Sequence, residues 1–232
     1  MNQPIVLIKQ ALARGQSALN EYDSKRFLSY FGIPVIREVL VHDAKSATVE
    51  AVKIGFPVAL KASGKNLFHK TEVGGVVLNL GSEEEVKKES RRLLKIQGCE
   101  TLLIQEMVKG DRELICGLKR DALFGPCVAF GIGGILTELL GDVVFRIAPL
   151  TLWDGHEMMK EIRSRGIVEP FRGESAADTD VLARTLVALG EIGLEYEEVA
   201  EIDINPMKIR SDGLPVSVDA LVVLTANREI HH

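Results

Sequence analysis

The stretch VALKASGKNLFHKTEVGGVVLNL, residues 58–80, contains two apolar runs that we expect to form strands, Val58–Ala62 and Gly75–Leu80. A loop rich in glycine, lysine and histidine joins them. It is longer than a plain hairpin connection needs to be, and the glycines at both ends would allow it to move. The stretch therefore predicts a pair of strands that carries a functional loop.

The rest of the chain changes irregularly between helical and strand patterns. Helices are expected at residues 3–14, 24–31, 43–55, 83–96, 154–164 and 180–190, and further strands at 102–108, 113–120, 128–130, 143–148, 201–209 and 215–224. Short turns between successive strands favour antiparallel pairs, and so an α+β fold rather than a regular βαβ fold. We expect Asp23 or Ser24 to cap the second helix, while Ser82 and Glu85 have capping-box spacing.

Composition limits the classes of function. The 232 residues suffice for one domain or two small lobes. A net charge of −5 without a basic tract argues against partners such as nucleic acid or an anionic membrane. The apolar runs are too short to span a bilayer, and the three cysteines lack metal-ligand spacing and suggest a reduced protein. The first residues do not resemble a secretory signal, so we expect a cytoplasmic protein.

An acidic strand is predicted near the end of the chain. Alternation points Glu201, Asp203 and Asn205 to one face, and Pro206 is expected to end the strand. Fourteen residues after Asn205, Asp219 lies inside an apolar run, where a carboxylate is costly to bury unless it is paired or bound to a metal. Neighbouring strands would bring these oxygen ligands together for Mg²⁺. Solvated acids at a strand end are the alternative.

Two other segments have residues suited to a nucleotide. Lys61, within an apolar strand, lies either at a sheet edge or opposite a fixed anion such as a phosphate. The segment Gln105–Val108 ends a strand, and Glu113 begins the next one. A hinge of this kind offers backbone groups to adenine, and Glu113 offers a carboxylate to ribose. Solvent-facing glutamates are the alternative.

His69 stands in the middle of the glycine-flanked loop, with Lys65 and Lys70 on either side. Histidine can act as a nucleophile towards phosphorus, and the lysines could steady the transferred charge. A surface histidine without a role is the alternative.

The turn Gly131–Gly134 fits neither a dinucleotide-binding nor a P-loop fingerprint, and a tight turn explains it equally well. Beyond it, Arg146 could clamp a phosphate. It could equally pair with Glu138 or Asp142.

Taken together, these segments resemble the ATP-grasp superfamily and, within it, the small beta subunits of ADP-forming acetyl-CoA synthetases. The string His-Lys-Thr-Glu-x-Gly-Gly-Val is the most diagnostic of them. The matching segments, in chain order, are Glu21–Lys25, Gly32–Val35, Lys61–Ser63, His69–Val76, Gln105–Met107, Gly133–Gly134, Phe145–Arg146, Asp203–Pro206 and Asp219.

The resemblance implies an ATP-grasp fold of two α+β lobes with ATP or ADP between them. We accordingly expect an N-terminal helical segment at 1–20, a lobe at 21–108 that carries the His69 loop, and a lobe at 109–232 that carries the metal site. It implies that Asn205 and Asp219 bind Mg²⁺, as the matching pair does in the related succinyl-CoA synthetase beta chain. The catalytic residues would be His69, Asp203 and Arg146, and the nucleotide-binding residues would be Lys25, Lys61, Gly74, Gly75, Glu106, Met107, Val108 and Glu113.

The resemblance also implies a reaction and a partner. A phosphoryl group would pass from a larger CoA-binding alpha subunit to His69 and then to ADP, in a hetero-oligomer of the alpha2beta2 kind. Two rival functions remain at this point: an ATP-grasp ligase that phosphorylates a carboxylate directly, and a non-catalytic nucleotide-binding module.

Overall fold

The computed structural model describes residues 3–64, 70, 73–134 and 141–225. The chain forms two compact units, unit 1 (residues 1–35 and 109–232) and unit 2 (residues 36–108). The chain passes from one unit to the other after residues 35 and 108, and the second of these points coincides with the boundary expected after residue 108. The expected start at residue 21 of the lobe that carries the His69 loop is wrong, because residues 1–35 belong to the same unit as the C-terminal strands.

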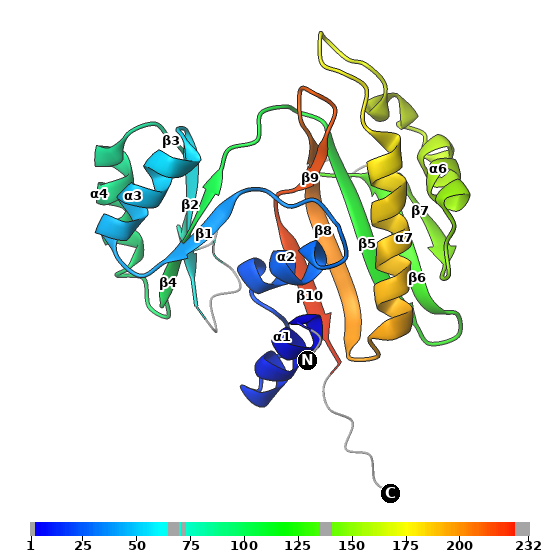
Figure 1. Ribbon diagram of the computed structural model, residues 1–232, viewed down its shortest axis with the longest axis horizontal. Coiled ribbons are helices and arrows are strands. Elements are labelled where there is room, and N and C mark those ends of the chain that lie inside the picture. The colour runs from blue at the N-terminus through cyan, green and yellow to red at the C-terminus, as the bar shows by residue number, and fades with distance from the viewer. Residues whose placement is uncertain (1–2, 65–69, 71–72, 135–140, 226–232) are drawn as a thin grey trace, which may run out of the picture. The chain divides into compact units, whose positions relative to one another are not determined.

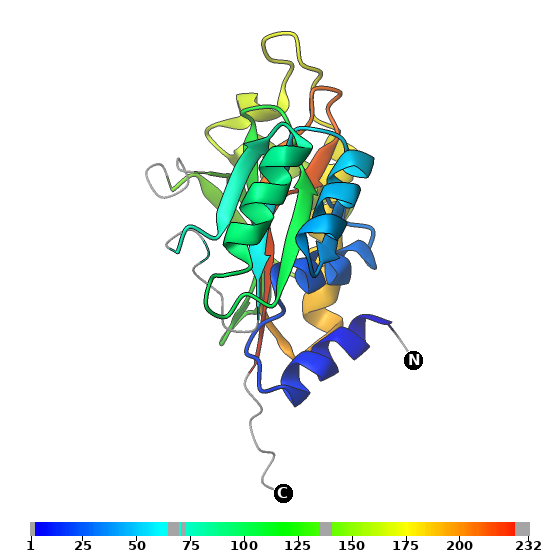
Figure 2. The same ribbon diagram turned by 90° about the vertical axis from the view of Figure 1, so that its left-hand side faces the viewer.

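Unit 2 is a four-stranded antiparallel sheet with two helices on one face. Its elements are β1 (Glu38–Val41), α3 (Ala44–Ile54), β2 (Val58–Ser63), β3 (Val76–Leu80), α4 (Glu83–Leu93) and β4 (Thr101–Glu106), and the strand order is β1-β4-β2-β3. Figure 2 shows α3 and α4 side by side. They enclose a core that includes Ala47, Ala51, Leu60, Val86 and Ile104.

Side-chain caps define where the helices of unit 2 begin. Asp43 accepts hydrogen bonds from the backbone N–H groups of Lys45 and Ser46, both at 2.8 Å. Ser82 accepts from the N–H of Glu85 at 3.3 Å, as predicted. The reciprocal bond of Glu85 goes to the N–H of Gly81 at 2.7 Å instead of to Ser82, so only one half of the expected capping box forms.

Unit 1 is built on a six-stranded antiparallel sheet with the path β10-β8-β5-β6-β7, and β9 pairs with β8 (Figure 1). Its elements are α1 (Gln3–Ala13), α2 (Glu21–Ser29), β5 (Glu113–Asp121), β6 (Gly125–Ile132), β7 (Val143–Ile147), α6 (Leu152–Glu161), the 3₁₀ helix η1 (Arg165–Val168), α7 (Thr179–Glu195), β8 (Val199–Ile209), β9 (Pro215–Ser217) and β10 (Ala220–Leu224).

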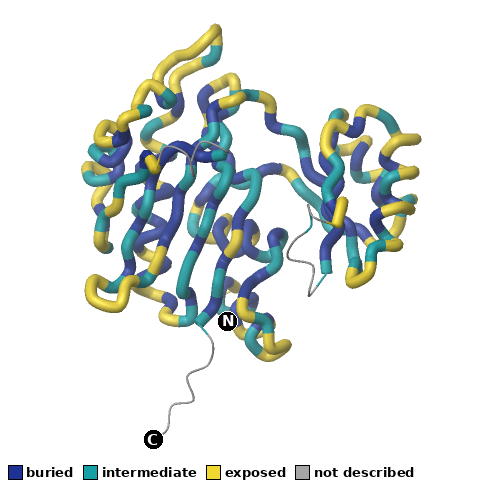
Figure 3. The backbone as a smooth tube through the Cα atoms, turned by 180° about the vertical axis from the view of Figure 1, so that it is seen from behind, coloured by how far each residue is buried: buried dark blue, intermediate teal, exposed yellow. Residues whose placement is uncertain are grey.

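Helices cover one face of this sheet, where α7 packs on β5 and β6 and α2 packs on β10. The buried side of the strands includes Leu118, Val128, Phe130, Ile202 and Val222. Figure 3 shows the opposite side of the same strands, where buried and half-buried residues alternate. None of the described helices covers this opposite face, called the helix-free face below, so its side chains are available for other tasks. Within the described residues, no helix combines the length and the apolar character needed to cross a membrane.

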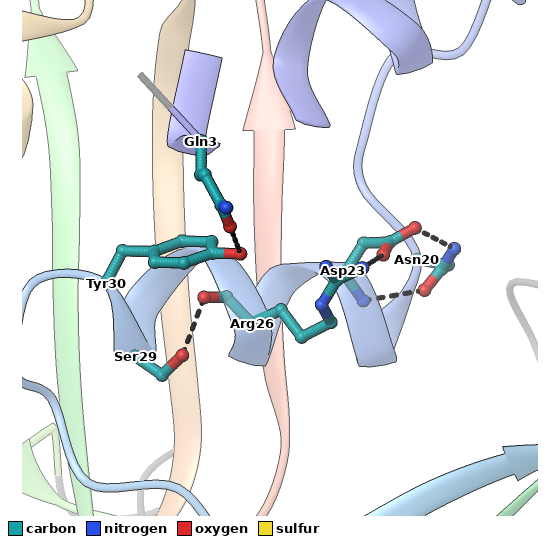
Figure 4. A network of polar contacts seen from close by, with 6 residues as sticks. All are labelled: Gln3, Asn20, Asp23, Arg26, Ser29 and Tyr30. Atoms are coloured by element: carbon teal, nitrogen blue, oxygen red, sulfur yellow. Dashed lines mark hydrogen bonds and ion pairs between the residues drawn. The ribbon is translucent and has the colours of Figure 1, made fainter. Parts of the chain in front are cut away.

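The start of α2 differs from the sequence prediction. Asn20 is the cap: its Oδ1 accepts from the N–H of Asp23 at 2.9 Å (Figure 4). Ser24 instead joins α2 to the sheet, because its Oγ accepts from the N–H of Val222 at 3.1 Å. The same figure shows Tyr30, the residue directly after α2, which donates its hydroxyl proton to Gln3 of α1 at 2.6 Å. Together these contacts fix both N-terminal helices to each other and to strand β10 of unit 1.

Strand β8 continues through Pro206 to Ile209, so the strand predicted at 201–209 is confirmed and the expected end at Pro206 is wrong. Leu114 of β5 pairs with Met207, whereas Cys116 pairs with Ile204, so β8 has one extra residue between these pairs. The segment Asn205-Pro206 thus forms a β-bulge, where proline is tolerated in a sheet.

Candidate functional site

The bulge of β8 lies beside the bend that carries Asp219. Asp219 is not inside a strand, as the sequence suggested, but at the bend between β9 and β10. The N–H of Asn205 donates to the carbonyl oxygen of Asp219 at 3.3 Å, and the N–H of Val218 donates to that of Pro206 at 3.0 Å. The two predicted metal ligands are therefore neighbours along a short ladder.

Asp203 belongs to the same group of oxygen atoms. It pairs with Gly117 of β5 and Leu221 of β10 and lies on the helix-free face. Burial raises the pKa of Asp203, and the negative charges of Glu201 and Asp219 raise it further. A cation among these carboxylates would remove this repulsion.

The glycine turn after β6 lies against the same group. The N–H of Gly134 donates to Oδ1 of Asn205 at 3.3 Å, and the N–H of Gly133 donates to the carbonyl oxygen of Glu113 at 2.7 Å. Gly134 has a φ of +69°, and a Cβ atom there would lie 2.2 Å from Oε2 of Glu113. The turn is thus more than a connection, because its close approach to Glu113 requires glycine.

Glu113 is held by a lysine that sequence reasoning did not single out. Lys208 lies opposite Glu113 in the sheet, and its Nζ is 3.0 Å from Oε1 of Glu113. The same ammonium donates to the carbonyl oxygen of Gly110 at 3.1 Å. The sequence contained one signal for this residue: a lysine two residues beyond Pro206, in a strand where apolar and polar residues otherwise alternate.

The donor set fits Mg²⁺. Asn205 and Asp219 offer an amide oxygen and a carboxylate, the hard oxygen ligands that magnesium takes in small number with water and nucleotide phosphates. Among the described residues, no cluster of three or more His, Cys, Asp or Glu has the arrangement of a metal site. This pair would accordingly need phosphate oxygens to complete the coordination.

In unit 2, Lys61 occupies an interior strand. β2 lies between β4 and β3, and Lys61 pairs with Leu103 on one side and Val76 on the other. The edge-strand interpretation is therefore wrong. Lys61 is 7% exposed, and it alternates with Leu60 and Ala62, which belong to the core beneath α3 and α4. Its side chain thus belongs to the face of the sheet away from those helices.

The described ends of the loop are anchored to unit 2. The N–H of Gly75 donates to the carbonyl oxygen of Lys70 at 2.6 Å, and a Cβ at Gly75 would lie 2.9 Å from that oxygen. The carbonyl oxygen of Gly74 accepts from Arg92 of α4 at 3.0 Å. At the other end, Gly64 packs closely on Gly98. His69 and Lys65 lie outside the described residues.

The predicted adenine hinge follows the end of β4. Glu106 is tied to Arg37 by two bonds, one from the N–H of Arg37 to Oε1 of Glu106 at 2.9 Å and one from the N–H of Glu106 to the carbonyl oxygen of Arg37 at 3.0 Å. Met107 and Val108 follow as the last residues of unit 2. The Glu106 carboxylate is thus engaged within unit 2, which favours a contribution of this segment through its backbone.

The sequence is similar to proteins of one known family. The sequence matches the ATP-grasp domain family over residues 10–224. It is 36% identical to the beta subunit of acetate–CoA ligase (ADP-forming) I of Pyrococcus furiosus, over 94% of this chain and 96% of that protein. The chain belongs to the ATP-grasp family, among the beta subunits of ADP-forming acid–CoA ligases.

Two further ATP-grasp relatives extend the comparison. Acetate–CoA ligase (ADP-forming) I of Archaeoglobus fulgidus is 40% identical over 85% of this chain, which spans only 30% of that longer protein. A solved structure of acetyl-coenzyme A synthetase 1 from Ca. Korarchaeum cryptofilum, in complex with coenzyme A and Mg-AMPPCP, has a TM-score of 0.85. It is 40% identical, and the match covers 96% of this chain and all of that one.

Two residues assigned by the ATP-grasp resemblance are not brought to the oxygen cluster as expected. Arg146 pairs with Val128, a residue of the helix-covered face, and its guanidinium forms an ion pair with Glu161 of α6. Asp203 lies on the opposite face, so the structure does not support Arg146 as a phosphate clamp. The structure shows an ion pair between Arg146 and Glu161, while Glu138, one of the two expected partners, lies outside the described residues.

Lys25 is the second of these residues. Its side chain is fully buried, and its ammonium lies 3.0 Å from Oε1 of Glu21 and 2.9 Å from the carbonyl oxygen of Val218. An ammonium held in this way does not reach out to a nucleotide, so the structure does not support Lys25 as a direct contact.

Proposed function

We propose that this chain is the nucleotide-binding and phosphoryl-transferring component of an ADP-forming acid–CoA ligase. The overall reaction would convert acyl-CoA, ADP and phosphate to the free acid, CoA and ATP, with His69 as the phosphoryl carrier of this chain. The observation that carries the proposal is the cluster of Asp203, Asn205 and Asp219 at the bulge of β8, in a chain of this family.

Unit 1 would bind the metal and the ribose. Asn205 and Asp219 would hold Mg²⁺, which supplies charge neutralisation for the phosphates when bound. Glu113, aimed by its ion pair with Lys208, would accept hydrogen bonds from the ribose hydroxyls. Asp203 would orient the imidazole of His69 during transfer.

Unit 2 would bind the remaining parts of the nucleotide. Lys61 would meet a phosphate, and Glu106, Met107 and Val108 would offer backbone groups to adenine. Gly74 and Gly75 would let the backbone come close to the phosphates. Their anchoring by Arg92 and Lys70 gives this end of the loop a defined position.

In each direction of the transfer step, one bond to phosphorus forms and one breaks. An oxygen of the ADP β-phosphate attacks the phosphorus on His69, the P–N bond breaks, and its electron pair returns to the imidazole. In reverse, His69 attacks the γ-phosphorus of ATP, the new P–N bond forms, and ADP leaves. The solved Ca. Korarchaeum cryptofilum protein supports this relay by analogy, since one of its structures is described with a phosphohistidine segment pointing towards the nucleotide-binding site.

We further propose a larger CoA-binding partner. The relative from Archaeoglobus fulgidus is more than three times as long as its match to this chain, which covers 30% of it. The relative from Pyrococcus furiosus is instead a separate beta subunit. The partner here would supply the acyl and CoA chemistry, in an alpha2beta2 assembly in the cytoplasm.

Incubation of the chain with ATP labelled at the γ-phosphate and Mg²⁺ tests the proposal. We expect one acid-labile, base-stable phosphate, mapped to His69. An acid-stable phosphate, or none, would favour one of the two rival functions. The second arm assays acyl-CoA formation from acid, CoA and ATP without a partner, and full activity there would show that the chain has a CoA site of its own.

A further inference from the structure

A buried ion pair on α2 reaches the bend that carries Asp219. Lys25 is 0% exposed and Glu21 is 7% exposed. Burying two charges is expensive, and an apolar pair of similar volume often gives equal or greater stability. Stability of the fold is therefore a poor explanation for this pair, and the atoms that it contacts suggest a better one.

The carbonyl group that Lys25 holds belongs to the peptide between Val218 and Asp219. Because a peptide group is planar, fixing the carbonyl oxygen of Val218 also fixes the N–H of Asp219 and the direction in which that residue begins. The same bend is tied to the bulge of β8 through the N–H of Val218, which donates to Pro206 at 3.0 Å. The ammonium thus acts on the piece of backbone from which the Asp219 side chain projects.

We propose that Lys25 and Glu21 form a positioning pair for the metal ligand Asp219. Lys25 orients the Val218–Asp219 peptide so that the carboxylate and the Asn205 amide oxygen meet the same Mg²⁺. Glu21 holds the ammonium and balances its charge. The inference rests on the proposed function, and it gives Lys25 an indirect task in place of direct nucleotide contact.

A purely structural role would be to attach α2 to the sheet. Ser24, on the same helix, already does this through its bonds with the N–H of Val222 at 3.1 Å and the carbonyl oxygen of Leu19 at 3.3 Å. Ser24 is as fully buried as Lys25, but these bonds do not involve the bend at Asp219. Ser24→Ala is therefore a matched control, which weakens the attachment of α2 and leaves the bend in place.

The test uses the full chain with ADP and Mn²⁺ as the probe for the Mg²⁺ site, and counts free Mn²⁺ by electron paramagnetic resonance. In the double variant Glu21→Leu/Lys25→Met, both charges give way to apolar side chains of similar volume. We expect a melting temperature at or above that of the wild type, unchanged ADP affinity without divalent metal, and Mn²⁺ affinity with ADP reduced about tenfold or more. Ser24→Ala should lower the melting temperature and leave Mn²⁺ affinity unchanged.

If Mn²⁺ is present and the wild-type chain binds ADP but takes up no Mn²⁺ with it, the proposed function is overturned, and this inference with it. A wild-type chain that binds Mn²⁺ with ADP, beside a folded double variant of equal affinity, would overturn the inference alone. Should the double variant not fold, Glu21→Gln takes its place in the same assay. Unchanged Mn²⁺ affinity in that variant would overturn the inference, and a loss would support it.

Discussion

The N–H of Asn205 donates a hydrogen bond of 3.3 Å to the carbonyl oxygen of Asp219. This contact joins the bulge of β8 to the bend between β9 and β10. Neither the bulge nor the bend would be present in a regular pair of strands. It places one amide oxygen and one carboxylate on neighbouring residues of adjacent chain segments.

Asp219→Ala tests the proposed metal site directly. Since a bound metal supplies several kcal/mol of charge stabilisation, we expect His69 autophosphorylation from Mg-ATP to fall by about a hundredfold or more. Asp212→Ala is the control, because Asp212 is an exposed carboxylate in the β8–β9 turn that caps the N–H of Leu214. Equal phosphorylation in the two variants, measured with labelled ATP, would remove Asp219 from the site.

His69→Asn tests the phosphoryl carrier. We expect loss of the overall acyl-CoA reaction with the partner present, while ADP affinity stays within a few-fold, because a carrier takes no part in holding the nucleotide. His156→Asn is the matched control: its Nε2 is 3.0 Å from Asp180 on α7, and this partly exposed pair contributes about 1 kcal/mol or less. Retained turnover in His69→Asn would contradict the relay.

Gly134→Ala tests the contact between the glycine turn and Glu113. The variant adds a methyl group 2.2 Å from Oε2 of Glu113 at a φ of +69°, so it should displace Glu113 and weaken ADP binding. Gly125→Ala isolates the backbone cost, because Gly125 has a φ of +74° and open space around its Cβ. Both variants should lose about 1–2 kcal/mol of unfolding free energy, but only Gly134→Ala should lose ADP affinity in calorimetric titration.

Asp203→Asn tests the electrostatics of the oxygen cluster. The pKa of Asp203 is raised above its ordinary value of 3.8 by burial and by Glu201 and Asp219. The folded chain therefore holds a proton that the unfolded chain releases, and wild-type stability falls as pH rises from 3.8 through the raised pKa. The asparagine variant does not lose stability in this way, because its side chain does not titrate.

In metal-free urea unfolding, the free energy of unfolding of Asp203→Asn minus that of the wild type should thus grow as pH rises from 3.8 through the raised pKa of Asp203. Above that pKa the difference should stay constant. The same variant should transfer phosphate more slowly. A stability difference that is independent of pH would contradict the raised pKa.

The sequence predicted the parts of the site that depend on side-chain alternation. The placement of Glu201 and Asp203 on one face of a strand followed from a period of two and is confirmed, while the anion opposite Lys61 stays a prediction. These patterns are local, so they are visible without knowing which strands pair.

What the sequence missed depends on pairing between distant segments. Lys208 became significant only because it lies opposite Glu113 in the sheet. Arg146 faces the helices because its partner in β6 is Val128. The four-residue strand β1 was too short to predict, and it forms because Glu38–Val41 pairs along β4. Pro206 suggested a strand end, since a bulge cannot be told from a terminus until the register is known.

The division of the chain into an interrupted unit and a continuous one has a consequence for biosynthesis. Unit 2 is a single segment, residues 36–108, whose described strands pair only with one another, so it can fold while the ribosome is still making the remainder. Unit 1 cannot close so early: Lys25 precedes Val218, whose carbonyl oxygen it binds, by 193 residues. Helix α2 therefore cannot complete its contacts until the bend after β9 has been made, and a nascent chain stalled before Val218 would have a folded unit 2 within an incomplete unit 1, with the bend that carries Asp219 still to be synthesised.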